Sequence, residues 1–341
     1  MSPRPNAALE PSSWRLLAQA IAGREADLST LGDMDLPRIA AWHGIGPLLD
    51  RRAHEGSLTG LTKWVREALH HQARHTAVTE LAMQASTRRL MTHFDENAID
   101  SLLLKGAAVA EHVYPDAFLR PRCDTDVWVR ETEAGDVAET LSAFGYRVVN
   151  LSTNTASSRQ FQATPDAFQG EHLWFDIHYR LSNRSLFRDT LGFQECLDHA
   201  LPLQRVGAMS PALPGLLLHA ALHRVAHGRN SASQRMIWLY DIHLLYEAMA
   251  AGDRLAFTDL ALDRAQGTLC ATALEASRAA FGTAVSDKRL QTLSSGRATE
   301  PSARLLDAGR WAWAWSDLRG QESVRKKVAF GWELLRGRFN G

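Results

Sequence analysis

Two aspartates, Asp124 and Asp126, are separated by one residue at the start of a short apolar run. Side chains alternate along a strand, so both carboxylates would lie on the same side, roughly 7 Å apart along the chain. Two carboxylates directed at one point repel each other unless a cation lies between them. Mg²⁺ is a hard ion that proteins hold with one or two carboxylates together with substrate phosphates. The pair therefore favours a metal site, although an isolated Asp-x-Asp is also found in solvated loops and helix caps.

A third acid, Asp176, lies in a run of large residues that alternates cleanly between two faces. One face would carry Leu173, Phe175, Ile177 and Tyr179, and the other Trp174, Asp176 and His178. Asp is disfavoured in strands, so this position requires an explanation. Either Asp176 lies on an edge strand and points to water, or it is a third carboxylate of the metal site.

A glycine turn precedes the acids in the sequence Lys105-Gly106-Ala107. Glycine permits a phosphate to approach the backbone closely, and the start of the following helix offers free N–H groups and a positive dipole end. Lys105, Arg120 and Arg122 flank the acids and could hold phosphate oxygens. The alternatives for these cations are pairing with the same aspartates or a place on the surface.

Three histidines, His219, His223 and His227, recur every four residues and form a stripe along one helix face. No matching ligand set for zinc is evident. We expect the first two to face the cleft or to pack beneath it, and His227 to be exposed. Asp241 could bond to one of these histidines, touch an acceptor, or be a structural buried acid.

The elements that must position these residues change in character along the chain. Helical periodicity covers about 12–22, 36–54 and 61–94. Short strands are expected at 99–104, 125–129, 146–150, about 159–163 and 173–179, with helices at 107–113 and 135–144 among them. Helical patterns return at 213–226, 235–250, 255–281 and in the Trp-rich C-terminal part. The expected units are therefore a helical region 1–96, an α/β core 97–185 and a helical region 186–341.

Composition excludes several classes of protein. Lys and Arg balance Asp and Glu at 38 each, which makes long nucleic acid an unexpected partner. The polar stretch from Met1 to Pro11 has no signal-peptide pattern, and no apolar run approaches the ~20 residues that span a bilayer. The three cysteines are far apart and give no disulfide framework. We expect a cytoplasmic protein without membrane partners.

Several blocks in order resemble the bacterial uncharacterised nucleotidyltransferase family, within the DNA polymerase β-like nucleotidyltransferase superfamily. They are Leu103-Leu104-Lys105-Gly106-Ala107, Tyr114-Pro115-Asp116, Leu119-Arg120-Pro121, Asp124-Thr125-Asp126-Val127, Gly145-Tyr146, Phe175-Asp176-Ile177-His178-Tyr179-Arg180-Leu181, His219, His223 and Trp238-Leu239-Tyr240-Asp241-Ile242. Together they run from about Ile99 to Leu245.

The resemblance implies an α+β fold, in which a small mixed-sheet catalytic core is flanked by N-terminal and C-terminal helical regions. It implies that Asp124 and Asp126 bind two metal ions, Mg²⁺ or Mn²⁺. Asp176 would bind the catalytic ion and help to take the proton from the acceptor hydroxyl. Two-metal sites suit in-line displacement at phosphorus, which needs alignment and charge neutralisation.

The same resemblance places an NTP, with ATP as the expected donor, against Lys105, Gly106, Ala107, Arg120 and Arg122. His178, His219, His223 and Asp241 are candidates for the cleft or for contact with the acceptor. This chain departs from the superfamily pattern because Ala107 and Ala108 carry no hydroxyl and because the gap from Gly106 to Asp124 is long. Thr125 also stands where an apolar residue is usual.

The predicted activity is transfer of a nucleoside monophosphate from an NTP to an unidentified hydroxyl or phosphate, on a small molecule, a peptide or a protein. Two alternatives remain open. One is a catalytically silent regulatory or antitoxin-like binding protein on the same fold, against which the presence of all three acids speaks. The other is a phosphotransferase that uses the same acids, which only the reaction product would distinguish.

Overall fold

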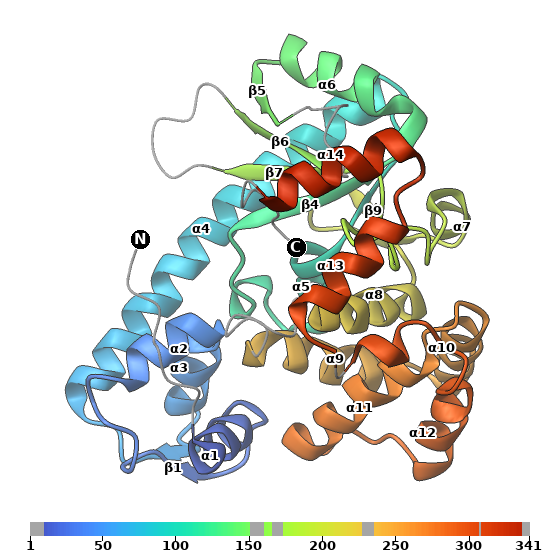
Figure 1. The fold of residues 1–341 in the computed structure, drawn as a ribbon. Helices are drawn as coiled ribbons and strands as arrows, with labels where there is room; N and C mark the ends of the chain where they lie inside the picture. The colour runs from blue at the N-terminus through green and yellow to red at the C-terminus, as the bar shows by residue number, and fades with distance from the viewer. Residues whose placement is uncertain (1–9, 151–159, 166–172, 227–234, 307, 336–341) are drawn as a thin grey trace.

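The computed structural model describes residues 10–150, 160–165, 173–226, 235–306 and 308–335 (Figure 1). Its main sheet has five strands in the order β3-β4-β7-β6-β5. Their bounds are β3 Ser101–Leu103, β4 Asp124–Val129, β5 Tyr146–Val149, β6 Gln160–Pro165 and β7 Trp174–His178. β4 and β7 are parallel and the other neighbours are antiparallel, so the sheet is mixed. The predicted α+β class is confirmed.

Strand β7 lies inside the sheet, between β4 and β6. Residues Phe175 to His178 of this strand are all buried. An inner strand that is covered on both faces carries apolar side chains on both faces, which explains the dense run of large residues. Asp176 is therefore not an edge-strand acid that points to water, and that alternative is wrong.

The N-terminal helices are α1 Pro11–Ile21, α2 Leu36–His43, α3 Gly46–His54 and α4 Lys63–Glu96, and a short parallel pair joins β1 Ala26–Asp27 to β2 Leu58–Thr59. One helix was predicted over 36–54, and this is wrong. Gly44, with φ of 69°, ends α2 in the left-handed conformation, and Pro47 lies in the first turn of α3, where its missing N–H costs nothing. Figure 1 shows α4 running from these helices to the sheet.

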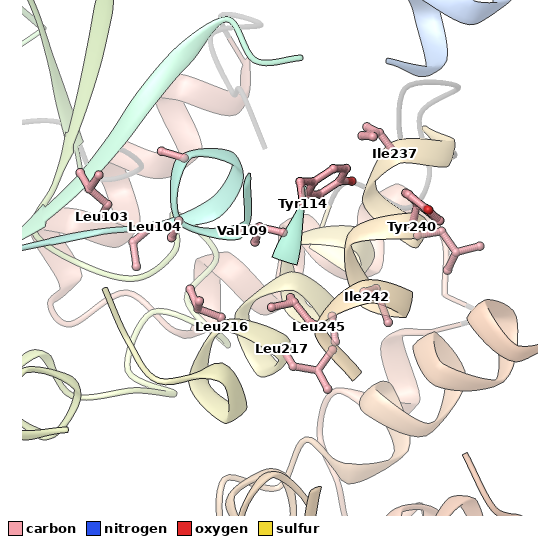
Figure 2. Close-up of a cluster of buried hydrophobic side chains, with 14 of the residues drawn as sticks. Leu103, Leu104, Val109, Tyr114, Leu216, Leu217, Ile237, Tyr240, Ile242 and Leu245 are labelled. Carbon is pink, nitrogen blue, oxygen red and sulfur yellow. The ribbon is translucent and has the colours of Figure 1, made fainter. Parts of the chain in front are cut away.

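Helix α5, Lys105–Val113, connects the sheet to the C-terminal helices α8, Leu213–Ala226, and α9, Met236–Ala248, which both pack against it. Figure 2 shows the apolar side chains that fill this junction, with Val109 and Tyr114 from the α5 segment facing Leu216, Leu217, Tyr240 and Leu245. The buried cluster is continuous from the sheet into α8 and α9. This packing fixes α5, and with it Lys105, relative to the strands that carry the acids.

The remaining elements are α6 Ala134–Ala143, α7 Phe193–Asp198, the antiparallel pair β8 Leu201–Leu203 and β9 Ala208–Ser210, α10 Ala251–Asp263, α11 Gly267–Phe281, α12 Asp287–Leu293, α13 Arg310–Arg319 and α14 Val324–Leu335, with short 3-10 turns between some of them. One helix was predicted over 255–281, but the chain breaks at Ala265, whose φ is 52°. α7, β8 and β9 have no counterpart in the sequence prediction.

The C-terminal tryptophans Trp311, Trp313 and Trp315 all lie on α13. Trp313 is buried, and the other two are exposed, as a helix requires for residues two apart. Asp317, one turn further, accepts hydrogen bonds from Arg184 Nη1 (2.6 Å) and from the backbone N–H of Ser185 (2.9 Å). These bonds tie α13 to the segment that follows β7.

One hydrophobic cluster contains residues from all three predicted regions. The boundaries at residues 97 and 186 stay a prediction. No helix in the described part of the chain is long and apolar enough to cross a lipid bilayer.

Candidate active site

Asp126 on β4 and Asp176 on β7 are register partners on neighbouring parallel strands. Both side chains are buried, with exposed fractions of 5% and 8%. Their carboxylates and the imidazole of His178 form a group in which one possible ligand atom from each residue lies within 4.8 Å of the others. Three buried ligands of this kind could hold a divalent cation.

Two glutamines on β6, which lies on the opposite side of β7 from β4, bind the Asp176 carboxylate. Gln160 Nε2 donates to Oδ2 and Gln162 Nε2 donates to Oδ1, both at 2.9 Å. Gln162 is also the register partner of Asp176. These bonds fix the orientation of the carboxylate and leave it further lone pairs. The sequence prediction missed both glutamines, although they alternate on one strand as Asp124 and Asp126 do.

Lys105 places a cation among the acids. Its Nζ donates to Asp126 Oδ1 at 2.5 Å and lies 3.4 Å from His178 Nε2, which itself lies 2.8 Å from the same oxygen. Burial would raise the pKa of Asp126, but the Lys105 charge and the His178 hydrogen bond hold it well below its usual range. Burial would likewise lower the pKa of Lys105, and the charge of Asp126 outweighs that effect and raises it. The pair is therefore ionised around neutral pH.

The backbone of Lys105 is in the left-handed region, with φ of 47°. A non-glycine residue rarely adopts this conformation. It turns the chain from β3 into α5, and the Lys105 side chain lies against Asp126. The strained backbone conformation of this turn is thus at Lys105, whose side chain is the ammonium group, and not at Gly106.

Asp124 differs from Asp126 in its electrostatics. Burial, and then the charge of Asp126, raise the pKa of Asp124 to about 7. Asp124 is not part of the 4.8 Å group formed by Asp126, Asp176 and His178. Without a bound cation, the protein therefore holds one protonatable carboxyl next to one that is firmly ionised.

A cavity of about 330 Å³, which we call the Gly106 cavity, opens beside these acids. The residues that line it come from α2, α5, the loop before β4, β4 itself, α8, and α9 with its N-cap. They are Ala41, Lys105, Gly106, Val109, Arg120, Pro121, Arg122, Cys123, Asp124, Asp126, Leu216, His219, Ala220, His223, Arg235, Trp238 and Asp241.

Arg120 occupies the space next to Gly106. A Cβ at Gly106 would lie 2.3 Å from Arg120 Nη1, so any other residue there must displace this guanidinium. The other side of the guanidinium forms a fork with Asp241, where Nη2 donates at 2.7 Å and Nε at 3.2 Å to Oδ2. Tyr114 Oη donates to Asp241 Oδ1 at 2.8 Å. Asp241 thus pairs with Arg120 and Tyr114 and not with either predicted histidine.

Arg122 has a different partner from the one predicted. Its Nε and Nη2 donate to the two carboxylate oxygens of Glu80 on α4, at 2.9 and 3.0 Å, and both side chains are buried. Its Nη1 donates to the Asp124 carbonyl at 3.1 Å and to the Thr125 hydroxyl. Arg122 therefore anchors the start of β4 to α4, which leaves little of its fork for phosphate.

A second cavity of about 240 Å³, which we call the Asp176 cavity, lies on the other side of Lys105. It is lined by Lys105, Gln160, Asp176, His178, Leu181, Ser182, Asn183, Arg184, His219, Leu222, His223 and Ala226. Lys105, His219 and His223 line both cavities and so form the wall between them.

The two predicted histidines of α8 meet the site. Burial, and then the Lys105 charge, lower the pKa of His219 to about 3, so its imidazole is neutral. His223 contacts Trp238 edge to face, with ring centroids 4.7 Å apart. His227 lies outside the described residues.

Asp50, His54 and His70 on α3 and α4 form a second group whose ligand atoms lie within 4.8 Å. Both histidines are exposed, and none of the three residues lines either cavity.

The model of a family described as "Uncharacterised nucleotidyltransferase" matches residues 32–280. Among solved structures, the solution structure of the antibiotic-resistance factor ANT(2'')-Ia is similar, with 12% identity, coverage of 59% of this chain and 98% of that chain, and a TM-score of 0.37. No curated protein matches.

Proposed function

The chain belongs to the uncharacterised nucleotidyltransferase family, and we propose that it transfers a nucleoside monophosphate from an NTP, with ATP as the expected donor, to an acceptor group, using Mg²⁺ or Mn²⁺. One observation carries the proposal. Asp126 and Asp176 are buried partners on parallel strands, and Asp124 precedes Asp126 on the same strand. A buried cluster of acids is costly to a fold unless a cation is bound there.

The donor set fits a divalent cation. Asp126, Asp176 and His178 offer two carboxylates and one imidazole within 4.8 Å, and the ammonium of Lys105 already bonds to Asp126 as a resident cation. We assign Asp124, Asp126 and Asp176 as the metal-holding acids, with His178 as a neighbour that bonds to Asp126. A bound divalent ion would neutralise charge that develops on the phosphoryl oxygens.

We place the triphosphate in the Gly106 cavity. The superfamily hydroxyl that Ala107 lacks has a substitute here, because the Arg120 guanidinium lies against Gly106 and is held in place by Asp241 and Tyr114. Arg120 and Lys105 then provide the fixed positive charge for the phosphates. Arg122 positions Asp124 by donating a hydrogen bond to the backbone carbonyl of Asp124.

We place the acceptor in the Asp176 cavity, which Ser182, Asn183 and Arg184 line with polar groups. The acceptor oxygen forms a bond to the α-phosphorus, the bond from that phosphorus to the bridging oxygen breaks, and pyrophosphate leaves. The acceptor proton passes to Asp176, whose orientation Gln160 and Gln162 fix. Because His219 is neutral, it adds no positive charge to the wall between the two cavities, and Lys105 supplies that charge.

The test is incubation with each labelled NTP and Mg²⁺ or Mn²⁺, with cell extract as the source of acceptor and mass spectrometry of the products. A mass increase of one nucleoside monophosphate, with pyrophosphate release, is expected for the wild type and not for Asp124→Asn or Asp126→Asn. Asp259→Asn, an exposed acid on α10, is the matched control and should keep full turnover.

The same products separate the two alternatives. Transfer of a single phosphoryl group with release of nucleoside diphosphate would replace the proposal with a phosphotransferase. Absence of any product, together with absence of metal-dependent nucleotide binding, would support the alternative of a catalytically silent binding protein.

A further inference from the structure

A third cavity, of about 300 Å³, lies where helix α1 meets α8, α9 and α11. We call it the arginine cavity. It is lined by Trp14, Arg15, Arg224, Arg235, Leu239, Ala276, Ala279 and Ala280. The three alanines follow helical spacing on α11 and present small side chains on one face, which leaves room above that helix.

The charge of this cavity is unbalanced. Three of its lining residues are arginines, and none is acidic. In the part of the chain that the structure describes, no ion pair is found for Arg15, Arg224 or Arg235, although the charges of Asp124 and Asp241 reach Arg235 from the Gly106 cavity. Helix α8, which carries Arg224, contains no acidic residue. Arginine is almost never buried in a folded protein unless its charge is paired, so several arginines gathered around one cavity favour an anionic ligand.

Arg224 is the residue that most requires a partner. It is partly buried, and burial lowers the pKa of its guanidinium, with no neighbouring charge to offset that effect. Arg15 lies at the exposed end of the cavity. A guanidinium presents its donors in a rigid fork that matches the oxygens of a phosphate group.

Arg235 connects the arginine cavity to the Gly106 cavity, because its side chain lines both. Its Nε donates to the Trp42 carbonyl at 2.9 Å, which fixes one edge of the guanidinium. Arg235 is also the N-cap residue of α9, a helix of 13 residues with no acid in its first turn. The positive end of that helix therefore adds to the charge of the arginines.

We propose that the arginine cavity binds a phosphate group of a substrate that extends into the Gly106 cavity. Arg224 and Arg235 supply the principal hydrogen bonds, and Arg15 adds charge at the entrance. The proposal rests on the proposed function in assigning the phosphate to a substrate of that reaction. The phosphate comes either from the triphosphate of the nucleotide or from a phosphorylated acceptor.

The test measures binding of inorganic phosphate and of pyrophosphate by calorimetry in EDTA, without turnover. Arg224→Gln and Arg15→Gln are compared with the wild type and with Arg66→Gln, an exposed arginine on α4. We expect the wild type and Arg66→Gln to bind alike, and Arg224→Gln to bind about tenfold more weakly or worse, as loss of a charged hydrogen bond implies. Arg15→Gln, at the exposed end, keeps the test valid if Arg224→Gln does not fold.

Two results would overturn the proposal: no binding of either anion by the wild type, or equal affinity in the wild type and both test variants. Asp124→Asn separates this proposal from the proposed function, since it should lose turnover and keep anion binding. Titration with Mg²⁺ and ATP then identifies which substrate carries the phosphate that binds in the arginine cavity. A parallel loss of ATP affinity in Arg224→Gln assigns the cavity to the nucleotide, and phosphate binding that persists at saturating ATP assigns it to the acceptor.

Discussion

Lys105 Nζ lies 2.5 Å from Asp126 Oδ1, so the acid that is best placed to hold a metal ion already has a cationic partner from the same chain. Lys105→Met should destabilise the metal-free protein by about 3 kcal/mol, because it leaves a buried carboxylate without its partner. Added Mg²⁺ should then raise the melting temperature of this variant more than that of the wild type. Thermal melts in EDTA and in Mg²⁺ measure both effects, with exposed Lys288→Met as the control. Equal melting of variant and wild type in EDTA would contradict this.

Asp124→Asn should stabilise the metal-free protein above neutral pH. Burial and the Asp126 charge raise the pKa of Asp124 to about 7, well above its usual range, so the folded state binds this proton more tightly than the unfolded chain does. Ionised Asp124 therefore opposes folding increasingly as the pH rises from about 4 to 7, by about 4 kcal/mol once it is fully ionised. The gain in the variant should grow over that range and stay constant above pH 7. Denaturant melts from pH 5 to 8 measure it.

Asp126→Asn should have the opposite effect on stability. Burial opposes ionisation, but the Lys105 charge and the His178 hydrogen bond lower the pKa of Asp126, so its stabilisation is present above the unfolded pKa and is lost only at strongly acidic pH. At pH 7 in EDTA this variant should melt below the wild type. Both aspartate variants should lose turnover, although one should be more stable than the wild type and the other less stable. The loss of activity would then not be a consequence of the change in stability. Two shifts of the same sign would refute the electrostatic difference between them.

Gly106→Ala should be destabilising, because the new Cβ would lie 2.3 Å from Arg120 Nη1 and must displace the guanidinium from Asp241. Overpacking of this kind typically costs about 1–3 kcal/mol. Nucleotide affinity should fall as well, since Arg120 provides charge beside the turn. Gly135→Ala is the control, because its Cβ would meet nothing within 4 Å on α6. It should be neutral or stabilise slightly. A fully stable and active Gly106→Ala would show that Arg120 moves without cost.

Glu80→Gln should lower activity although Glu80 lies outside both cavities. It weakens the buried fork to Arg122, which holds the Asp124 carbonyl and the Thr125 hydroxyl. Loss of one partner of a buried ion pair costs about 3–5 kcal/mol, and a displaced Asp124 should lower kcat more than it raises KM. Glu67→Gln, exposed on the same helix, is the control. An unchanged kcat in a folded Glu80→Gln variant would show that the pair of Glu80 and Arg122 does not position Asp124.

Local sequence pattern was enough to identify the five strands of the main sheet and the aspartates on two of them. Period-two alternation places Asp124 and Asp126 on one side of β4 and marks β7 around Asp176, because side-chain direction along a strand depends only on the residues of that strand. The long periodic helix α4 and the break after β3 follow from the same local rules. Boundaries failed where a single backbone conformation decided them, at Gly44 and Ala265.

The partners of each site residue were decided by tertiary structure. The insertion of β7 between β4 and β6 brings Asp126 opposite Asp176, and the pairing of distant strands depends on contacts that no local window contains. The same holds for Arg120 with Asp241 and Arg122 with Glu80, each joined across the fold. The sequence identifies which residues carry charge. The packing of α4 and α5 against the sheet, and of α9 against α5, determines which of those charges neutralise one another and which remain in a cavity.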